Sequence, residues 1–232
     1  MAQRDGARTL TAHFRAVLRS EILSGDLAPG SRLQPAVLAG RYGTSTTVVR
    51  EVLAQLVNER LVTARPNQGY YVVRLSLPEL QDLTLVRCHN DTLALGLAVE
   101  RGDLAWETGI MAAFHVLSRT SRRSPDDPAH TTEEWAAAHR VFHLALVAAC
   151  GVRILVDVAE ICFDATELYR RWAAPSPAAT GRAIEDEHRA ILDACLERDA
   201  DRAQERLAEH YRTTLEVILR AGLRAESATA EQ

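Results

Sequence analysis

The sequence predicts a mainly α-helical protein in two parts, and three observations lead to that prediction. Residues 1–75 carry short helical patterns followed by two β-favouring runs, which is the order of a winged helix-turn-helix with a small β wing. From Leu77 onward, apolar residues recur at helical spacing with almost no strand signal, which indicates an all-α bundle. Residues 1–75 hold ten Arg against five acidic residues, whereas residues 76–232 hold seventeen against twenty-six. A basic head on an acidic body is typical of a head that meets nucleic-acid phosphates.

A tight turn between two short helices is predicted around Gly43. The first helix ends near Leu38 and Ala39, and the glycine tolerates the backbone conformation that such a turn requires. Thr44 and Ser45 follow, and their hydroxyl groups can cap the next helix by accepting its free backbone N–H groups. This arrangement predicts the turn of a helix-turn-helix.

The helix after the turn is predicted to be a recognition helix. Its apolar side chains recur at helical spacing and form one buried face: Val48, Val49, Val52, Leu53 and Leu56. Thr46, Thr47 and Arg50 then fall on the opposite, exposed face near the start of the helix. A recognition helix places its base-reading side chains at this end.

A two-stranded wing is predicted after that helix. Val62-Thr63 and Tyr70–Val73 favour strands, and Pro66–Gly69 separates them with Gly69 near the tip. The predicted DNA-contacting residues are Arg32, Arg41, Ser45, Thr46, Thr47, Arg50, Gln68 and Gly69. Arg32 and Arg41 have a second interpretation, as surface residues on the phosphate side or in ion pairs.

The body is predicted to form a helical bundle over residues 76–226, followed by a polar tail over residues 227–232. Ser76 is a predicted cap, with Pro78 in the first turn of the helix that follows. The expected helices cover residues 77–101, 104–119, 132–149, 152–172, 178–198 and 200–221, with a loop over 121–131.

Four histidines in the body point toward a common core. His139 and His143 are spaced i,i+4, so they lie on one face of one helix. His188 and His210 lie eleven residues before and after Asp199, the expected turn of a helix hairpin, which puts them at the same height. Together the four predict a metal site inside the bundle. The alternative is that each is a hydrogen-bonded core histidine.

Residues 22–73 resemble the winged helix-turn-helix of the GntR family of bacterial transcription regulators. The resemblance rests on Leu38–Gly43, Thr44–Leu56 and the run around Pro66–Gly69. It implies a regulator that binds a double-stranded DNA operator. The family commonly has Ser-Arg-Thr where this chain has Ser45-Thr46-Thr47, so one base or phosphate contact is missing and the operator sequence is left open.

Residues 77–221 resemble the FCD ligand-sensing domain of the FadR subfamily. The resemblance rests on Phe142-His143, Ala149–Gly151, Glu187-His188, and Asp199 with His210. Many members bind a divalent metal through one Asp and three His. By position His143, His188 and His210 match the three histidines, and His139 stands where the Asp usually lies.

The exchange of Asp for His changes the charge of the implied metal site. One carboxylate and three imidazoles leave a divalent site at a net charge of +1, whereas four neutral imidazoles leave +2. Imidazole ligands favour Zn or Ni, and the more positive site attracts an anion. Alternatively, His139 does not ligate and three histidines hold the ion. Arg87 resembles an FCD pocket arginine that clamps a carboxylate effector; the alternative is an intrahelical pair with Asp91.

The expected function is a cytoplasmic, ligand-responsive transcription regulator of the repressor type, with activation left open. It would bind a pseudo-palindromic operator as a homodimer and sense a small carboxylate through its metal-containing body. The sequence shows no signal peptide, no membrane-spanning run and no paired cysteines. Two alternatives stay open: a metal-dependent enzyme fused to a DNA-binding head, and a direct metal sensor. The enzyme is disfavoured because no H-E-x-x-H motif is present.

Overall fold

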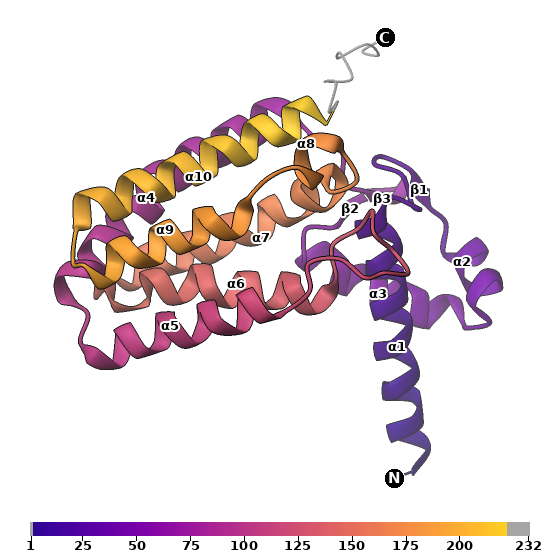
Figure 1. Cartoon of the computed structure of the whole chain (residues 1–232). Coiled ribbons are helices and arrows are strands. Elements are labelled where there is room, and N and C mark those ends of the chain that lie inside the picture. The colour runs from indigo at the N-terminus through magenta and orange to yellow at the C-terminus, as the bar shows by residue number, and fades with distance from the viewer. Residues whose placement is uncertain (1, 222–232) are drawn as a thin grey trace. The chain divides into compact units, whose positions relative to one another are not determined.

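The chain divides into two compact units between Leu75 and Ser76 in a computed structural model that describes residues 2–221. The first unit combines helices with a small sheet, and the second is helical throughout (Figure 1). The predicted fold class, a winged helix-turn-helix plus an all-α bundle, is therefore confirmed. The predicted tail, residues 227–232, lies outside the described residues. None of the described helices is long and apolar enough to cross a membrane.

The first unit contains the predicted helix-turn-helix and wing. Its elements in chain order are α1 (Ala2–Ser24), β1 (Arg32–Leu33), α2 (Pro35–Tyr42), α3 (Thr46–Asn58), β2 (Val62–Arg65) and β3 (Gly69–Val72). Gly43 ends α2 in the left-handed conformation, with φ of 61°, and the Ser45 hydroxyl accepts a hydrogen bond from the Val48 N–H. Both features are those that the sequence predicted for the turn.

The sheet has one strand more than the predicted two-stranded wing. β3 is central and pairs antiparallel with β2 on one side and with β1 on the other. β1 is only two residues long, so it offers no alternating pattern by which a sequence could reveal it. The buried face of α3 consists of Val49, Val52, Leu53 and Leu56, while Val48 is half-buried.

The second unit is a bundle of helices whose axes run side by side in Figure 1. Its elements are α4 (Leu77–Arg101), α5 (Leu104–Arg119), α6 (Glu133–Val147), a 3-10 turn (Ala148–Cys150), α7 (Arg153–Ala173), α8 (Pro177–Thr180), α9 (Ile184–Leu196) and α10 (Ala200–Arg220). Five of these α-helices begin with a side chain that accepts a hydrogen bond from a backbone N–H of the first turn. The capping residues are Ser76, Asp103, Thr132, Ser176 and Asp199.

The single helix predicted over 178–198 is wrong. The chain forms the short helix α8, leaves helical geometry at Ala183, where ψ is 57°, and starts α9 at Ile184. The interruption turns the Arg182 side chain inward, where its guanidinium donates hydrogen bonds to Glu187 and to the Thr214 hydroxyl. These tertiary contacts outweigh the modest gain of continuing the helix.

Candidate functional site

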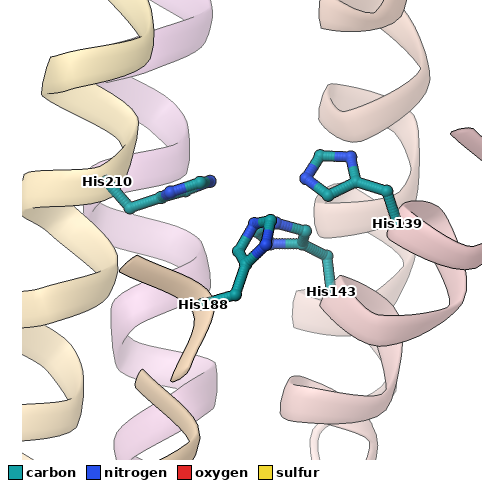
Figure 2. A group of neighbouring side chains, drawn as sticks. All are labelled: His139, His143, His188 and His210. Atoms are coloured by element: carbon teal, nitrogen blue, oxygen red, sulfur yellow. The ribbon is translucent and has the colours of Figure 1, made fainter. Parts of the chain in front are cut away.

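Four histidine side chains from three helices converge inside the second unit. His139 and His143 come from successive turns of α6, His188 from α9 and His210 from α10, as Figure 2 shows. One ligand atom of each lies within 4.8 Å of those of the others, and all four residues are buried. We call this group the histidine cluster. The structure thus brings together all four residues that the sequence singled out as metal ligands.

The helix hairpin expected around Asp199 accounts for half of this convergence. α9 and α10 flank Asp199, which caps α10 by accepting a hydrogen bond from the Arg202 N–H. The His188 and His210 rings consequently lie 4.8 Å apart between centroids. His188 and His210 are equally far from the turn along the chain, and their side chains therefore lie at the same height along the two helices of the hairpin.

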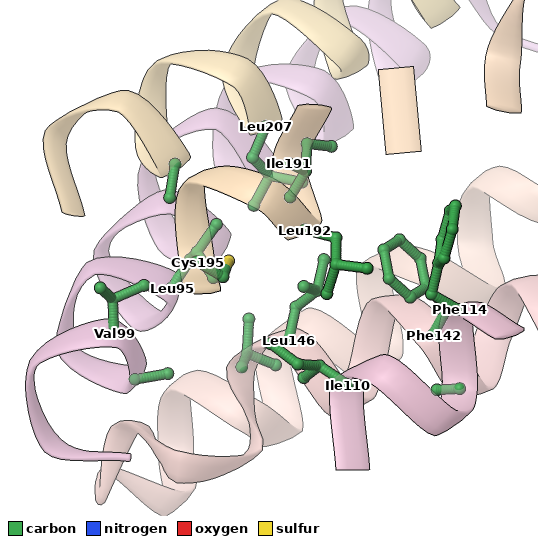
Figure 3. Close-up of a cluster of buried hydrophobic side chains, with 14 of the residues drawn as sticks. Leu95, Val99, Ile110, Phe114, Phe142, Leu146, Ile191, Leu192, Cys195 and Leu207 are labelled. Atoms are coloured by element: carbon green, nitrogen blue, oxygen red, sulfur yellow. The ribbon is translucent and has the colours of Figure 1, made fainter. Parts of the chain in front are cut away.

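An apolar core holds the helices that carry the cluster. Figure 3 shows it as buried side chains from α4, α5, α6, α9 and α10, among them Leu95, Ile110, Phe142, Leu146, Ile191 and Leu207. Phe142 lies between the two α6 histidines in sequence, and its ring centroid is 5.3 Å from that of His188. Close packing of this kind restricts the positions that the imidazoles can adopt.

The spacing of the cluster suits a metal ion bound by imidazole. The Nε2 atoms of His143 and His188 are 3.4 Å apart. Two ligands of a tetrahedral zinc site, at about 2.0–2.1 Å from the ion, would lie about 3.4 Å from each other. That is too long for a good hydrogen bond between the two rings and matches one edge of a coordination tetrahedron.

Two ring nitrogens of the cluster have no hydrogen-bond partner among the residues that the structure describes. They are His139 Nε2 and His143 Nδ1, and both are buried. Buried polar atoms are nearly always satisfied, so two orphans in one cluster require an explanation. A divalent ion bound by His139 Nε2 explains the first of these atoms. His143 can offer an ion only one of its two nitrogens, and its Nε2 already faces His188 Nε2, so the same ion does not account for His143 Nδ1. Four buried imidazoles, one with a free inward nitrogen, fit the metal that the sequence predicted.

Burial also keeps the histidines in the form that binds metal. It lowers the pKa of His188 to about 3, with a smaller contribution from the charge of Arg182. Burial is the largest cause of a lowered pKa for His139, His143 and His210 as well, followed by neighbouring histidines. At neutral pH the cluster thus offers neutral imidazoles, the ligand form for Zn, Ni or Cu.

A carboxylate that the sequence did not place stands behind the cluster. Glu187 precedes His188, yet it contacts His210, whose Nδ1 lies 2.8 Å from the Glu187 carboxylate. An Nδ1–H donated to Glu187 leaves the Nε2 lone pair of His210 free to bind a metal. Arg182 holds Glu187 in turn, with both guanidinium–carboxylate contacts at 2.5–2.7 Å. Because this contact joins two helices, spacing along one helix could not reveal it.

A cavity of about 50 Å³ opens beside the histidine cluster. His139 and His210 form part of its wall, together with four arginines, Arg122, Arg170, Arg171 and Arg182. We call it the arginine cavity. Its volume corresponds to about three to five water molecules, since one water needs about 10–15 Å³. A small polar ligand could therefore reach the histidine cluster from this side.

Arg87 lies apart from the arginine cavity. Its guanidinium binds Asp91 at 3.2 Å, and Tyr211 donates a hydrogen bond to the same carboxylate oxygen at 2.9 Å. A separate cavity of about 10 Å³ contacts Arg87 instead. The structure thus shows the intrahelical Arg–Asp pair, which gives the buried guanidinium its counter-charge. The role of Arg87 as an effector clamp stays a prediction.

The predicted base-reading side chains lie on the exposed start of α3. Thr46, Thr47 and Arg50 are all exposed, whereas the Ser45 hydroxyl is engaged as the helix cap. Arg41 forms an ion pair with Glu21 at 3.0 Å and leaves half of its side chain exposed. The sequence left Arg41 open between a DNA contact and a surface ion pair, and the structure shows the ion pair.

The wing exposes the other predicted DNA contacts. Gln68 and Gly69 are exposed at the turn between β2 and β3, and Arg32 is exposed on β1. The structure adds Arg65, which pairs with Gly69 across the hairpin and places its guanidinium 4.5 Å from the Tyr71 ring centroid. The sequence could have revealed Arg65 as the last residue before the wing turn. The head therefore presents arginines on both the recognition helix and the wing.

Comparison with known proteins identifies both units. Residues 10–72 match the bacterial regulatory proteins of the gntR family, and residues 82–213 match the FCD domain. The chain is 36% identical over 206 residues to the HTH-type transcriptional regulator BphR of Paraburkholderia xenovorans, covering 89% of this chain and 84% of the relative. It is 33% identical over 207 residues to the HTH-type transcriptional repressor GlaR of Escherichia coli, covering 88% and 93%.

A solved structure shares the fold over most of the chain. The structure of McbR/YncC of Escherichia coli superimposes with a TM-score of 0.65 at 21% sequence identity, covering 91% of this chain and 97% of that one. At this identity the likeness concerns the fold.

Proposed function

Since this chain belongs to the GntR family of bacterial regulatory proteins and carries a C-terminal FCD domain, we propose that it is a metal-containing, effector-responsive repressor. A homodimer binds a pseudo-palindromic operator in the bacterial cytoplasm, and a small carboxylate in the arginine cavity changes its affinity for that operator. The repressor mode is supported by the similarity to GlaR, which is named a repressor. The relatives and both families are transcription regulators, so the enzyme alternative is set aside.

The observation that carries the proposal is the convergence of four buried histidines, together with the unsatisfied Nε2 of His139. His143, His188 and His210 hold the metal, with His139 as fourth ligand. When bound, a divalent ion supplies a positive charge at the wall of the arginine cavity. Four neutral imidazoles do not reduce that charge, so an anionic ligand is favoured over a neutral one.

DNA recognition is proposed to use both exposed parts of the head. Thr46, Thr47 and Arg50 would read base edges in the major groove, as the first residues of a recognition helix do. Arg32 and Gln68-Gly69 would contact the backbone beside the wing. Arg41 would contact phosphate only through the exposed half of its side chain, because its guanidinium already forms an ion pair with Glu21.

Dimerisation is proposed through one exposed apolar patch of the body. Leu85 and Leu93 on α4 and Ile154 and Ile161 on α7 are each about half exposed or more. The two helices run antiparallel, because Ser76 contacts Tyr169 and Asn90 contacts Leu155, so the four side chains fall at matching heights. We call them the α4–α7 patch. A second copy that covers the patch would give the two-fold symmetry that a palindromic operator requires.

The proposal is tested with the purified full chain and an operator fragment. We expect the metal-loaded protein to bind the operator, and a screen of short carboxylic acids to reveal one that shifts the operator affinity. His188→Ala combined with His210→Ala should abolish that shift and keep operator binding. His89→Ala with His115→Ala, two exposed histidines of the body, should behave as wild type.

The direct metal sensor is distinguished by the same assay. If metal removal alone changes operator affinity and no acid does so, the metal is the signal. If the double variant responds to the acid with unchanged affinity, the sensing site lies outside the histidine cluster and the proposal is wrong.

A further inference from the structure

Three of the four arginines in the arginine cavity already have carboxylate partners. Arg170 binds Glu167 at 2.7 Å, and Arg171 binds Glu167 and Glu133 at 2.7 and 2.6 Å. Arg182 binds Glu187 at 2.5 Å. These pairs neutralise most of the positive charge in the wall.

Arg122 is the exception. Among the residues that the structure describes, no carboxylate forms an ion pair with its guanidinium, and its buried Nε atom has no hydrogen-bond partner. Burial, followed by the charges of Arg123 and Arg182, lowers the pKa of Arg122 to about 10, against an opposing effect of Glu187, and this still leaves Arg122 charged at neutral pH. Arg122 is half-buried, and a buried donor without a partner is costly, so an anion that accepts a hydrogen bond from Nε would be stabilising at this position.

The position of Arg122 is fixed relative to the histidine cluster. Its carbonyl accepts a hydrogen bond from the N–H of Thr132, the residue that caps α6. Its guanidinium lies 5.4 Å from the Trp135 ring, and that ring stacks on His139 with centroids 4.6 Å apart. One row of contacts thus leads from the proposed metal ligand His139, through Trp135, to Arg122.

We propose that Arg122 is a second anion-binding position in the arginine cavity, and that the effector is a short acid with two anionic groups. One group binds at the metal of the histidine cluster, and the other accepts hydrogen bonds from the Arg122 guanidinium. The cavity volume limits the spacer between the two groups to a few atoms. This inference rests on the proposed function, because it requires the metal to bind the first group.

The test compares acids that differ only in the second anionic group. Malonate and propionate have three carbons each, and succinate and butyrate have four. We expect isothermal titration calorimetry on the metal-loaded full chain to show that the better diacid binds about tenfold to a hundredfold more tightly than its monoacid, as a charged hydrogen-bonded contact implies. In Arg122→Gln that ratio should collapse to near one, with the monoacid affinity and the metal content unchanged.

Two further variants separate the role of Arg122 from a general charge effect. Arg119→Gln removes an exposed arginine from the end of the preceding helix and should retain the wild-type ratio. Arg122→Lys keeps the charge and loses the two-pronged donor, so its ratio should lie between those of wild type and Arg122→Gln.

Each failure has its own signature. Equal binding of diacid and monoacid by the wild type overturns the inference and leaves the proposed function standing. A loss of diacid and monoacid binding by the same factor in Arg122→Gln also overturns it, because Arg122 would then shape the cavity as a whole. If none of the four acids binds to metal-loaded protein, the inference and the carboxylate effector of the proposed function both fail.

Discussion

At the scale of single residues, the charge of the site depends on where its carboxylate stands. The FCD resemblance implies a direct Asp ligand in many members, and this chain has His139 at that position, as the sequence already indicated. The nearest carboxylate, Glu187, contacts the outer nitrogen of His210 instead and is itself held by Arg182. The chain thus keeps a carboxylate on the far side of a proposed ligand, where it can orient the His210 imidazole through a hydrogen bond.

Glu187→Gln should weaken metal binding without removing any proposed ligand. The amide cannot supply the negative charge that strengthens His210 as a ligand, so we expect metal affinity to fall about tenfold to a hundredfold. Competition with a chromogenic chelator measures it. Glu185→Gln, an exposed position on the same helix, is the matched control. Equal affinities for wild type and Glu187→Gln would show that Glu187 has no part in metal binding.

The metal-free protein should lose stability as the pH falls below neutral. Because the pKa of folded His188 is lowered to about 3, the unfolded chain takes up a proton at higher pH than the folded chain does. The stabilisation is complete above the unfolded pKa of about 6.5 and is lost as the pH falls toward about 3. Between about pH 7.5 and pH 5.5, His188 alone should account for about 1.4 kcal/mol of the free energy of unfolding.

Urea unfolding in the presence of a chelator measures this effect. The chain's three tryptophans, Trp106, Trp135 and Trp172, all lie in the second unit, so their fluorescence reports on that unit. The pH dependence should be weaker in His188→Asn and unchanged in His89→Asn. An identical dependence in wild type and His188→Asn would contradict the prediction.

At the scale of elements, the sequence predicts those helices and contacts that follow from the spacing of apolar residues or from equal distances to a turn. The helices that became α4, α5 and α10 follow apolar residues at helical spacing, and the meeting of His188 with His210 follows from their equal distance to Asp199. The break between α8 and α9 escaped prediction, because it depends on what Arg182 contacts after folding. The role of Arg122 could not be predicted either, because Arg122 lies in a loop, where residues follow no regular spacing that would indicate their contacts. Arg87 was open between two roles, and the structure shows the pair with Asp91, while the effector role stays a prediction.

Arg50 on α3 is expected to read a base. Its side chain is exposed on the same surface as Thr46 and Thr47, and a guanidinium that binds one guanine is worth about 1–3 kcal/mol of discrimination. Arg50→Ala should therefore weaken binding to the operator far more than binding to random DNA in a fluorescence anisotropy titration. Arg32→Ala, which removes a proposed backbone contact, should weaken both by a similar factor. Equal losses in Arg50→Ala would make Arg50 a phosphate contact.

At the scale of the whole molecule, regulation requires that the body joins two heads. One recognition helix reads few base pairs, so specific binding needs a second copy related by two-fold symmetry. The α4–α7 patch offers an apolar surface on the helix that directly follows the head in the chain. Its four apolar side chains would stay exposed in a monomer, and a second copy that covers them would remove them from water.

Leu93→Glu should dissociate the dimer. A charge in the α4–α7 patch would be buried without a partner, so we expect a monomer at micromolar concentration by sedimentation velocity, with operator affinity reduced accordingly. Leu104→Glu, at an equally apolar but more exposed position on α5, should remain dimeric. A dimeric Leu93→Glu protein would place the interface elsewhere.

Native mass spectrometry of the full chain tests the central claim, that the histidine cluster is a metal centre. After incubation with zinc or nickel and removal of the excess, wild type should carry one divalent ion per chain, and His188→Ala with His210→Ala should carry none while keeping its helical circular-dichroism spectrum. The account predicts that difference because the four imidazoles are the proposed ligands. A wild-type chain that carries no ion, or a folded double variant that still carries one, would contradict it.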